Sequence, residues 1–543
     1  MIKIGILIKE FDKLEYWELD IIDKIINTPY LRLELLIKDG RDKNYFNYGH
    51  SFLSKAIFKI QKLIERNIFF KRKKHPNQES ILNYLKSVET INLSPIRKRY
   101  VDFFNEKDSK SIKDKKLDIL LRHEFGIIKG KILDSTKYGI WSFHHGDNSI
   151  NRGGPAGFWE IVLEEAYVGV TLQKLTDELD GGEIIDKAYF NRHWSYIKTR
   201  DLVFNASVSL LFKNLQLLNA NTSTTKKSGL YYNPLYKSPN LYYTFFYLSK
   251  FYKKLTVKFF KKFINKIFGV KFNSWTLFIG KGNFLNSTLF RIKPVKIPRN
   301  EFWADPFLFD FEGENYVFFE NYCYHSKKGK ISCGKIMNGN IYDVKDVLNP
   351  NYHLSYPFIF EEDNFIYMIP ETHENKRLEI FRCIKFPDQW ELYSTAFEGE
   401  LIVDASYFRD KENNKWLFLN KSKNIDIPFD NELYIYKIDN LSLTNIISHD
   451  LNPVLIDSRI ARNAGPIFKH ENFYYRPSQA NVENIYGRYL NINKIVELSL
   501  SSYKEEKIIT VKPNFHKNLN AIHHLHQHKN IFVFDGALNY KVK

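Results

Sequence analysis

The chain has few cysteines and lacks any long uncharged apolar run. Its three cysteines, Cys323, Cys333 and Cys383, form no C-x-x-C pair and no even disulfide set. This pattern predicts no disulfide framework and is typical of a reducing compartment, by default the cytoplasm. No uncharged apolar stretch approaches the roughly 18 residues that a spanning helix needs. The first residues run directly into acidic ones, so they predict a strand and not a signal peptide.

Positive charge and aromatic residues are abundant. Lys and Arg exceed Asp and Glu by 18, and 16% of the residues are aromatic. This charge implies attraction to nucleic acid, to a phosphate-bearing substrate or to an anionic membrane surface. The 44% hydrophobic content excludes a disordered or fibrous chain. Because single cores stop growing at roughly 250 to 300 residues, 543 residues predict two principal domains.

The N-terminal part alternates between strand-like and helix-like segments. Strands are expected at residues 2–8, 31–37, 117–121 and 138–143. Helical patterns lie at 16–26 and 200–220. The alternation predicts a parallel sheet covered by helices, whose active site lies at the carboxyl ends of the strands. We assign this α/β domain to residues 1–220.

Residues 221–271 form a separate basic and aromatic segment. It begins with NTSTTKKSG, which has linker composition, and continues through Leu241 to Gly269, which holds seven lysines and no acid. Lysines interleaved with aromatic residues are typical of a helix in a membrane interface, here a peripheral contact at the inner face of the membrane. A helix packed between two domains, with a solvated basic face, is the alternative.

From residue 272 the chain changes to short aromatic strands separated by polar turns. Five related signatures recur, beginning at Ala304, Tyr356, Asp404, Gly465 and Ile522. Their spacing of about 50 to 60 residues is the length of one four-stranded blade. The pattern predicts an all-β five-bladed propeller over residues 272–543.

The stretch from Ser142 to Asp180 carries the clearest functional motif. Its elements are His144, Arg152-Gly153, Gly169-Val170-Thr171 and Leu179-Asp180. In this order they resemble the core of the folate-dependent formyltransferases, which include methionyl-tRNA and sugar N-formyltransferases. The resemblance implies a Rossmann-like domain that takes a formyl group from N10-formyltetrahydrofolate, its co-substrate, and passes it to an amine.

The resemblance assigns the chemistry to His144 and Asp180, with Ser142 in place of the family's Asn. A histidine near neutral pH can accept the amine proton, and an aspartate within reach raises its basicity. A serine hydroxyl is shorter than an amide and rotates freely, so slower, re-routed or lost catalysis is expected, and a domain that binds without reacting is the alternative. The residues expected to bind the folate are Gly126, Arg152, Gly153 and Asp180.

The β-rich part resembles the five-bladed furanosidase-like propellers, specifically that of plant glucosamine inositolphosphorylceramide transferases. Hydrolases on this scaffold use acids at a central funnel, and Asp305 and Asp404 match two of them. Ala464 stands where a general acid is usual, which favours glycan binding over hydrolysis. His523 and His524 are expected to line the funnel as hydrogen-bonding groups, and no metal is expected, because they lack partners at a recognised ligand spacing.

Together these assignments predict an N-formyltransferase that acts on an amino sugar, nucleotide-linked or in a glycolipid, during surface polysaccharide or glycoconjugate assembly. Nucleic acid is not the favoured partner, since a propeller replaces the small C-terminal barrel expected for contact with methionyl-tRNA. Two alternatives stay open: a non-catalytic carbohydrate-binding protein, and a glycosyl transferase or hydrolase centred on Asp305 and Asp404.

Overall fold

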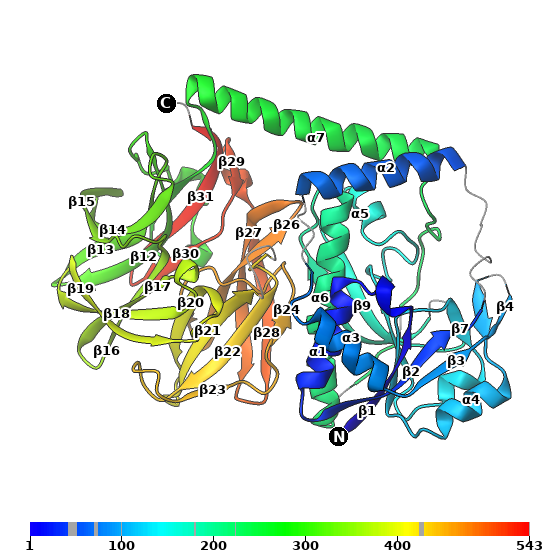
Figure 1. Ribbon diagram of the computed structural model, residues 1–543. Coiled ribbons are helices and arrows are strands. Elements are labelled where there is room, and N and C mark those ends of the chain that lie inside the picture. Colours follow the sequence, from blue (N-terminus) through cyan, green and yellow to red (C-terminus); the bar gives the residue numbers. More distant parts are fainter. Residues whose placement is uncertain are drawn as a thin grey trace. The chain divides into compact units, whose positions relative to one another are not determined.

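A computed structural model gives the fold in two parts (Figure 1). It describes residues 1–41, 52–69, 74–98, 100–178, 181–222, 224–227, 229–422 and 428–541. These residues form two compact units, Met1–Lys254 and Leu255–Lys543. The division falls inside helix α7, Leu241–Phe268. The boundaries predicted from the sequence, 1–220, 221–271 and 272–543, and the function predicted for each of these parts, stay predictions.

A seven-stranded sheet forms the centre of the first unit, in the order β10-β9-β8-β6-β1-β2-β3. Its strands are β1 (Ile2–Ile8), β2 (Leu31–Asp39), β3 (Thr90–Leu93), β6 (Ile119–Arg122), β8 (Ile140–His144), β9 (Val168–Lys174) and β10 (Glu183–Phe190). The first five run parallel, whereas β9 and β10 pair antiparallel. The parallel α/β fold predicted for this part is confirmed.

Helices and a small second sheet complete the first unit. The helices are α1 (Tyr16–Asn27), α2 (Phe52–Phe69), α3 (Gln78–Ser87), α4 (Glu106–Lys113), α5 (Phe158–Val162) and α6 (Tyr196–Asn219). The small sheet joins β4 (Ile96–Lys98), β5 (Val101–Phe103) and β7 (Ile127–Lys129). In α1 the buried Trp17, Ile21 and Ile25 repeat every four residues, so one face of the helix joins the core.

A buried carboxylate ties three helices of this unit together. Glu65 on α2 accepts hydrogen bonds from Ser195 Oγ at 2.5 Å, from the Ile197 backbone N–H at 3.1 Å and from Tyr247 Oη at 2.5 Å. A buried charge is stable only when such donors surround it. These bonds anchor the first half of α7, which carries Tyr247, to α2 and to the start of α6.

The second unit consists of five sheets of four or five strands. One joins β11 (Lys271–Lys281), β29 (Leu519–Ala521), β30 (Leu525–His528) and β31 (Ile531–Lys541). The next joins β12 (Glu301–Phe311), β13 (Glu314–Cys323), β14 (Lys328–Met337) and β15 (Asn340–Leu348). A third joins β16 (Ser355–Glu362), β17 (Phe365–Glu371), β18 (Leu378–Lys385) and β19 (Gln389–Ala396). The fourth joins β20 (Leu401–Arg409), β21 (Lys415–Ser422), β22 (Glu432–Ile438), β23 (Ile446–Ser448) and β24 (Leu455–Ile456). The fifth joins β25 (Phe468–His470), β26 (Phe473–Val482), β27 (Ile485–Leu498) and β28 (Tyr503–Val511).

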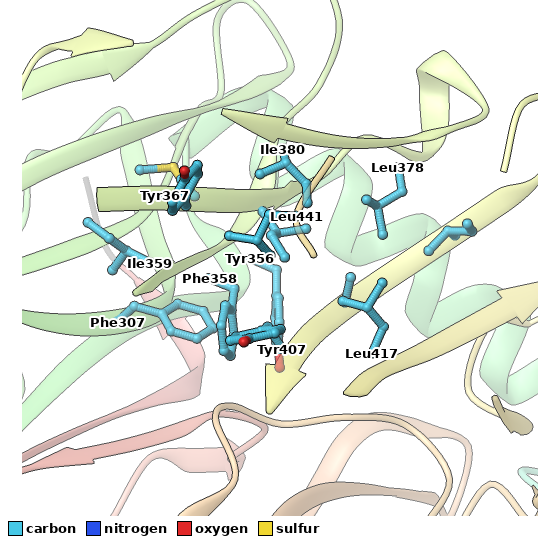
Figure 2. Packing of buried hydrophobic residues seen from close by; sticks show 14 of the residues in the cluster. Phe307, Tyr356, Phe358, Ile359, Tyr367, Leu378, Ile380, Tyr407, Leu417 and Leu441 are labelled. Carbon is cyan, nitrogen blue, oxygen red and sulfur yellow. The ribbon is translucent and has the colours of Figure 1, made fainter. Parts of the chain in front are cut away.

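Three neighbouring sheets share one apolar core, and the first sheet joins the two ends of the unit. Phe307 on β12, Tyr356 on β16 and Tyr407 on β20 belong to one buried cluster (Figure 2). Strand β11 pairs antiparallel with β31, so the earliest and latest strands of the unit lie in the same sheet. The β-sheet fold predicted for residues 272–543 is therefore confirmed.

Candidate functional site

The predicted catalytic residues lie at one edge of the first unit's sheet. Strands β6 and β8 run parallel, with Arg122 opposite Ser142. His144 is the last residue of β8. Because parallel strands bring their carboxyl ends to the same edge, the loop after β6 and the end of β8 form one site.

A cavity of about 190 Å³ lies at this edge. It is lined by Trp17, Arg122, His123, Glu124, Phe125, Phe143, His145 and Phe204. Four buried polar atoms of the lining residues have no hydrogen-bond partner among the described residues: Trp17 Nε1, both ring nitrogens of His123, and His145 Nε2. Unpartnered buried polar atoms are costly, so the cavity is built to receive hydrogen-bonding groups.

Both cavity histidines are neutral. Burial lowers the pKa of His123 to about 3 and holds the pKa of His145 well below its usual value. His145 stacks on the Phe204 ring with centroids 3.9 Å apart, and Trp17 lies edge-on to His145. Aromatic walls that carry neutral donors and acceptors suit a flat, polar heteroaromatic ring.

The Ser142 hydroxyl accepts a hydrogen bond from the guanidinium group of Arg122. Arg122 donates from Nε to Ser142 Oγ at 2.9 Å and from Nη1 to the Gly126 carbonyl at 2.7 Å. Ser142 Oγ in turn donates to the Phe143 carbonyl at 3.4 Å, so its hydrogen points away from Arg122. The expectation of a freely rotating hydroxyl is therefore wrong.

His144 has a defined tautomer when neutral. Its Nε2 lies 2.6 Å from the carbonyl oxygen of Asn151. A carbonyl only accepts, so Nε2 carries the hydrogen and Nδ1 holds the lone pair. Asp180 lies outside the described residues, and its pairing with His144 stays a prediction.

Sequence reasoning missed a buried acid beside His144. Glu160 on α5 is 3% exposed, and neither carboxyl oxygen has a hydrogen-bond partner among the described residues. A Cβ added to Gly146 would lie 3.0 Å from His144 Nε2 and 3.5 Å from Glu160 Oε1, so both groups flank the same glycine. Burial raises the pKa of Glu160 to about 7. Its signal in the sequence is a single acid inside the apolar run FWEIV.

None of the described residues predicted for catalysis or folate binding lines the cavity itself, neither Ser142 and His144 nor Gly126, Arg152 and Gly153. Arg152 donates to the carbonyls of Asn148 and Gly229, at 2.9 and 3.1 Å. A Cβ on Gly153 would meet the Tyr236 carbonyl oxygen at 1.8 Å, so only glycine fits there. The structure thus packs both against residues 229–236, and their contact with folate stays a prediction.

Gly126 permits close packing beside the small sheet. Its N–H donates to Asp102 Oδ2 at 2.6 Å, and a Cβ there would meet the Tyr100 carbonyl oxygen at 2.8 Å. Asp102 is fully buried and also pairs with Arg41 and Arg97. Gly126 follows Phe125 of the cavity wall directly, so it fixes the path of the loop after β6. Its predicted contact with folate stays a prediction.

In the second unit, Asp404 is buried against an arginine. Arg462 Nε lies 2.6 Å from Asp404 Oδ2, and Arg462 Nη2 lies 3.7 Å from Glu371. Burial opposes ionisation of Glu371, but a 2.7 Å hydrogen bond with His373 and the charge of Arg462 outweigh it and lower its pKa to about 2. Burial raises the pKa of Asp404 to about 6 despite Arg462.

The structure brings Asp305, His523 and His524 together around an acid that sequence reasoning missed. Asp535 on β31 accepts from the backbone N–H groups of all three residues, at 2.9 to 3.2 Å. His523 Nδ1 lies 2.9 Å from Asp535 Oδ1, and 3.9 Å separate it from Asp305 Oδ1. Burial raises the pKa of Asp305 to about 8, and the charges of Asp535 and Asp404 add to the shift.

Asp305, His523 and Asp535 each present a ligand atom within 4.8 Å of the others, as a cation site would require. The sequence predicted no metal, because it did not place Asp535 beside the histidines. Both Asp535 oxygens already accept N–H groups, which favours a hydrogen-bonding role for this acid.

Comparisons with known proteins divide along the chain. Residues 290–533 match the family model "Glucosamine inositolphosphorylceramide transferase 1, N-terminal". A protein of that name from Oryza sativa subsp. indica is 33% identical over 210 residues, which are 38% of this chain and 28% of the rice protein. The chain therefore spans less than a third of the length of this relative.

The first unit has relatives of another kind. A methionyl-tRNA formyltransferase from Prochlorococcus marinus (strain NATL2A) is 26% identical over 189 residues, 33% of this chain and 55% of that protein. A solved sugar N-formyltransferase from Shewanella sp FDAARGOS_354 covers 46% of this chain and 88% of its own, with 14% identity and a TM-score of 0.30, too low to carry an argument. The chain thus combines a formyltransferase-like region with a C-terminal region like that of the glucosamine inositolphosphorylceramide transferases, as the motifs predicted.

Proposed function

We propose that the first unit transfers a formyl group from N10-formyltetrahydrofolate to the amino group of an amino sugar, nucleotide-linked or in a glycolipid. The carrying observation is the cavity beside His144, with unpartnered nitrogens on Trp17, His123 and His145. A pterin ring carries amino, carbonyl and ring-nitrogen groups in one plane, and these would satisfy such nitrogens. The residues present therefore fit the folate.

The chain's own groups can perform the proton and charge work. The bound folate supplies the formyl carbon. His144 Nδ1 accepts the proton that the attacking amine releases as it bonds to the formyl carbon, because Nε2–H is committed to Asn151. The imidazole then returns this proton to N10 of the folate, whose bond to the formyl carbon breaks. Ser142 donates to the formyl oxygen as charge develops there, and Arg122 polarises its hydroxyl. Glu160, whose pKa is raised by burial to about 7, is ready to exchange a proton beside the imidazole.

The second unit supports a sugar acceptor. Its relatives are named for glucosamine, and glucosamine has the free amine that formyl transfer requires. We propose that the five sheets are the blades of a five-bladed propeller closed by the pairing of β11 with β31. In this proposal Asp305, Asp404 and the two histidines, His523 and His524, bind the hydroxyl groups of a glycan.

A second candidate function is glycosyl transfer in the second unit. The observation that favours it is the difference in pKa between two buried acids, about 2 for Glu371 and about 8 for Asp305. Pairs of carboxyl groups that titrate apart serve as base and acid in glycoside chemistry.

The test mixes the full chain with N10-formyltetrahydrofolate and a panel of amino-sugar nucleotides and follows tetrahydrofolate release. Formyl transfer predicts release only with an amino-sugar acceptor, and its loss in His144→Ala. The matched control is His325→Ala, which changes an exposed histidine of the second unit. Full activity of His144→Ala contradicts the mechanism, and sugar transfer without tetrahydrofolate release supports the second candidate.

A further inference from the structure

The second half of α7 is mostly exposed, and its side that carries Lys261 and Asn265 contacts residues 270–272. We call Leu255–Phe268 the basic-aromatic segment; eleven of its fourteen residues are exposed and none is buried. In the first half of the same helix, Thr244, Tyr247 and Phe251 are buried. The helix therefore continues into water after its buried part ends.

This segment has two distinct rows of side chains. Phe259, Phe263 and Ile267 are spaced by four residues and are 67%, 49% and 54% exposed. Lys258, Lys262 and Lys266 have the same spacing one position earlier, so their row lies about 100° around the helix from the apolar row. Exposed Phe260 widens the apolar row, and the segment contains no acid.

The lysine row and the apolar row together indicate which class of partner the basic-aromatic segment binds. A nucleic acid would take up the lysines through its phosphates but would leave the phenylalanine row in water. An anionic bilayer accepts both, since aromatic side chains enter the region below the headgroups and lysine stems reach out to the phosphates. No described helix of the chain is long and apolar enough to cross a bilayer. A helix of this kind lies in the plane of the interface.

We infer that the basic-aromatic segment docks this protein on an anionic lipid surface, with Phe259, Phe260, Phe263 and Ile267 inserted and the lysines at the headgroups. The inference does not rest on the proposed formyl transfer, because it uses only residues outside the candidate active site. It gives the chain a second binding function, for which the ligand class is phospholipid with net negative charge.

Vesicle sedimentation with the full chain tests the inference. Vesicles of phosphatidylcholine alone are compared with vesicles in which about one third of the lipid is phosphatidylglycerol. Attraction of each lysine to an anionic surface multiplies across a row, so binding to the anionic vesicles is expected to be about 100-fold tighter. Absence of binding, or equal binding to both vesicles, overturns the inference.

Two variants separate charge from insertion. Changing Lys258, Lys261, Lys262 and Lys266 to Gln should remove most of the preference for anionic vesicles. Changing Phe259, Phe263 and Ile267 to Gln should weaken binding to every vesicle at least 10-fold. The control changes four exposed lysines elsewhere in the second unit, Lys281, Lys385, Lys411 and Lys469, to Gln and alters net charge equally. An equal loss in the control overturns the inference, because net charge alone would then explain binding.

A spectroscopic measurement keeps the inference falsifiable if a multiple variant fails to fold. In Phe263→Trp, brominated anionic lipids should quench more fluorescence than in the parent protein. No additional quenching overturns insertion of the apolar row. Binding of a polyanion such as heparin with no binding to vesicles also overturns the inference, in favour of a nucleic-acid partner.

Discussion

The candidate sites of the two units differ in whether their polar groups already have partners within the protein. At the edge of the first sheet, Trp17, His123 and His145 present polar atoms with no hydrogen-bond partner among the described residues. In the second unit the acids are already engaged, with Asp404 on Arg462 and Asp535 on three N–H groups. Both ring nitrogens of His524 in the second unit also have no hydrogen-bond partner among the described residues, so the two sites differ chiefly in that the second contains acids that are already paired. We propose that the first unit carries out the reaction and that the second binds the glycan.

The largest expected effect is on turnover in the first unit. Loss of a general base costs about 100- to 10,000-fold in rate, so His144→Ala should lower kcat/KM for formyl transfer by that range. Asp404→Ala should leave kcat unchanged and raise KM for the sugar. Initial rates of tetrahydrofolate release measure both. If the two variants lose kcat equally, the division of labour between the units is wrong.

The second prediction concerns stability of the second unit. Asp404→Asn removes the carboxylate that lies 2.6 Å from buried Arg462 and leaves only Glu371, 3.7 Å away, so the variant should lose up to about 3 kcal/mol, the lower end of the cost of breaking a buried pair. Urea unfolding followed by circular dichroism should detect this loss. The exposed pair of Lys335 and Glu314 supplies the control, since Glu314→Gln should cost less than about 1 kcal/mol. Equal losses of stability in the two variants would show that the buried pair of Asp404 and Arg462 contributes no more than a surface pair.

Glu160 makes the stability of the first unit depend on pH. Its pKa is about 7 in the folded chain and 4.5 in the unfolded chain, so the folded state holds the proton more tightly. The contribution of Glu160 to the free energy of unfolding is fully present below pH 4.5. It falls by roughly 3 kcal/mol as the pH rises through 7. Urea midpoints at pH 5 and pH 8 should show this loss in the parent and not in Glu160→Gln. Exposed Glu178→Gln should keep the parent's profile.

The smallest expected effect sharpens the contrast between open and paired polar groups. His123→Phe removes two unpartnered ring nitrogens from the cavity wall. The variant should gain about 1 kcal/mol in stability without ligand, because an unsatisfied buried polar group is lost. It should also bind 5-formyltetrahydrofolate about 10-fold more weakly, as measured by calorimetry. A stability loss with unchanged folate binding would contradict a ligand-binding role for the cavity.

Local patterns predicted the elements better than they predicted the sites. Short apolar runs were enough for β1, β2, β6 and β8, since strands buried on both faces read as continuous apolar segments. The repeated aromatic signatures predicted five sheets, because each signature marks one repeat along the chain.

The groups that complete each site come from distant parts of the chain. Trp17 and Phe204 reach the cavity from α1 and α6, and Asp535 reaches Asp305 from β31. No spacing rule joins residues so far apart in sequence. Arg122 could have been found, because it directly follows the strand predicted at residues 117–121, but only the pairing of β6 with β8 shows the contact with Ser142.

The pairing of β11 with β31 has a consequence for biosynthesis. Translation reaches β31 about 250 residues after β11, which at ribosomal speeds is a delay on the order of tens of seconds. Throughout that interval β11 is an unpaired strand edge on a growing polypeptide, open to pairing with other nascent chains. The second unit should therefore depend on molecular chaperones far more than the first, whose strand β1 meets its neighbour β2 soon after synthesis.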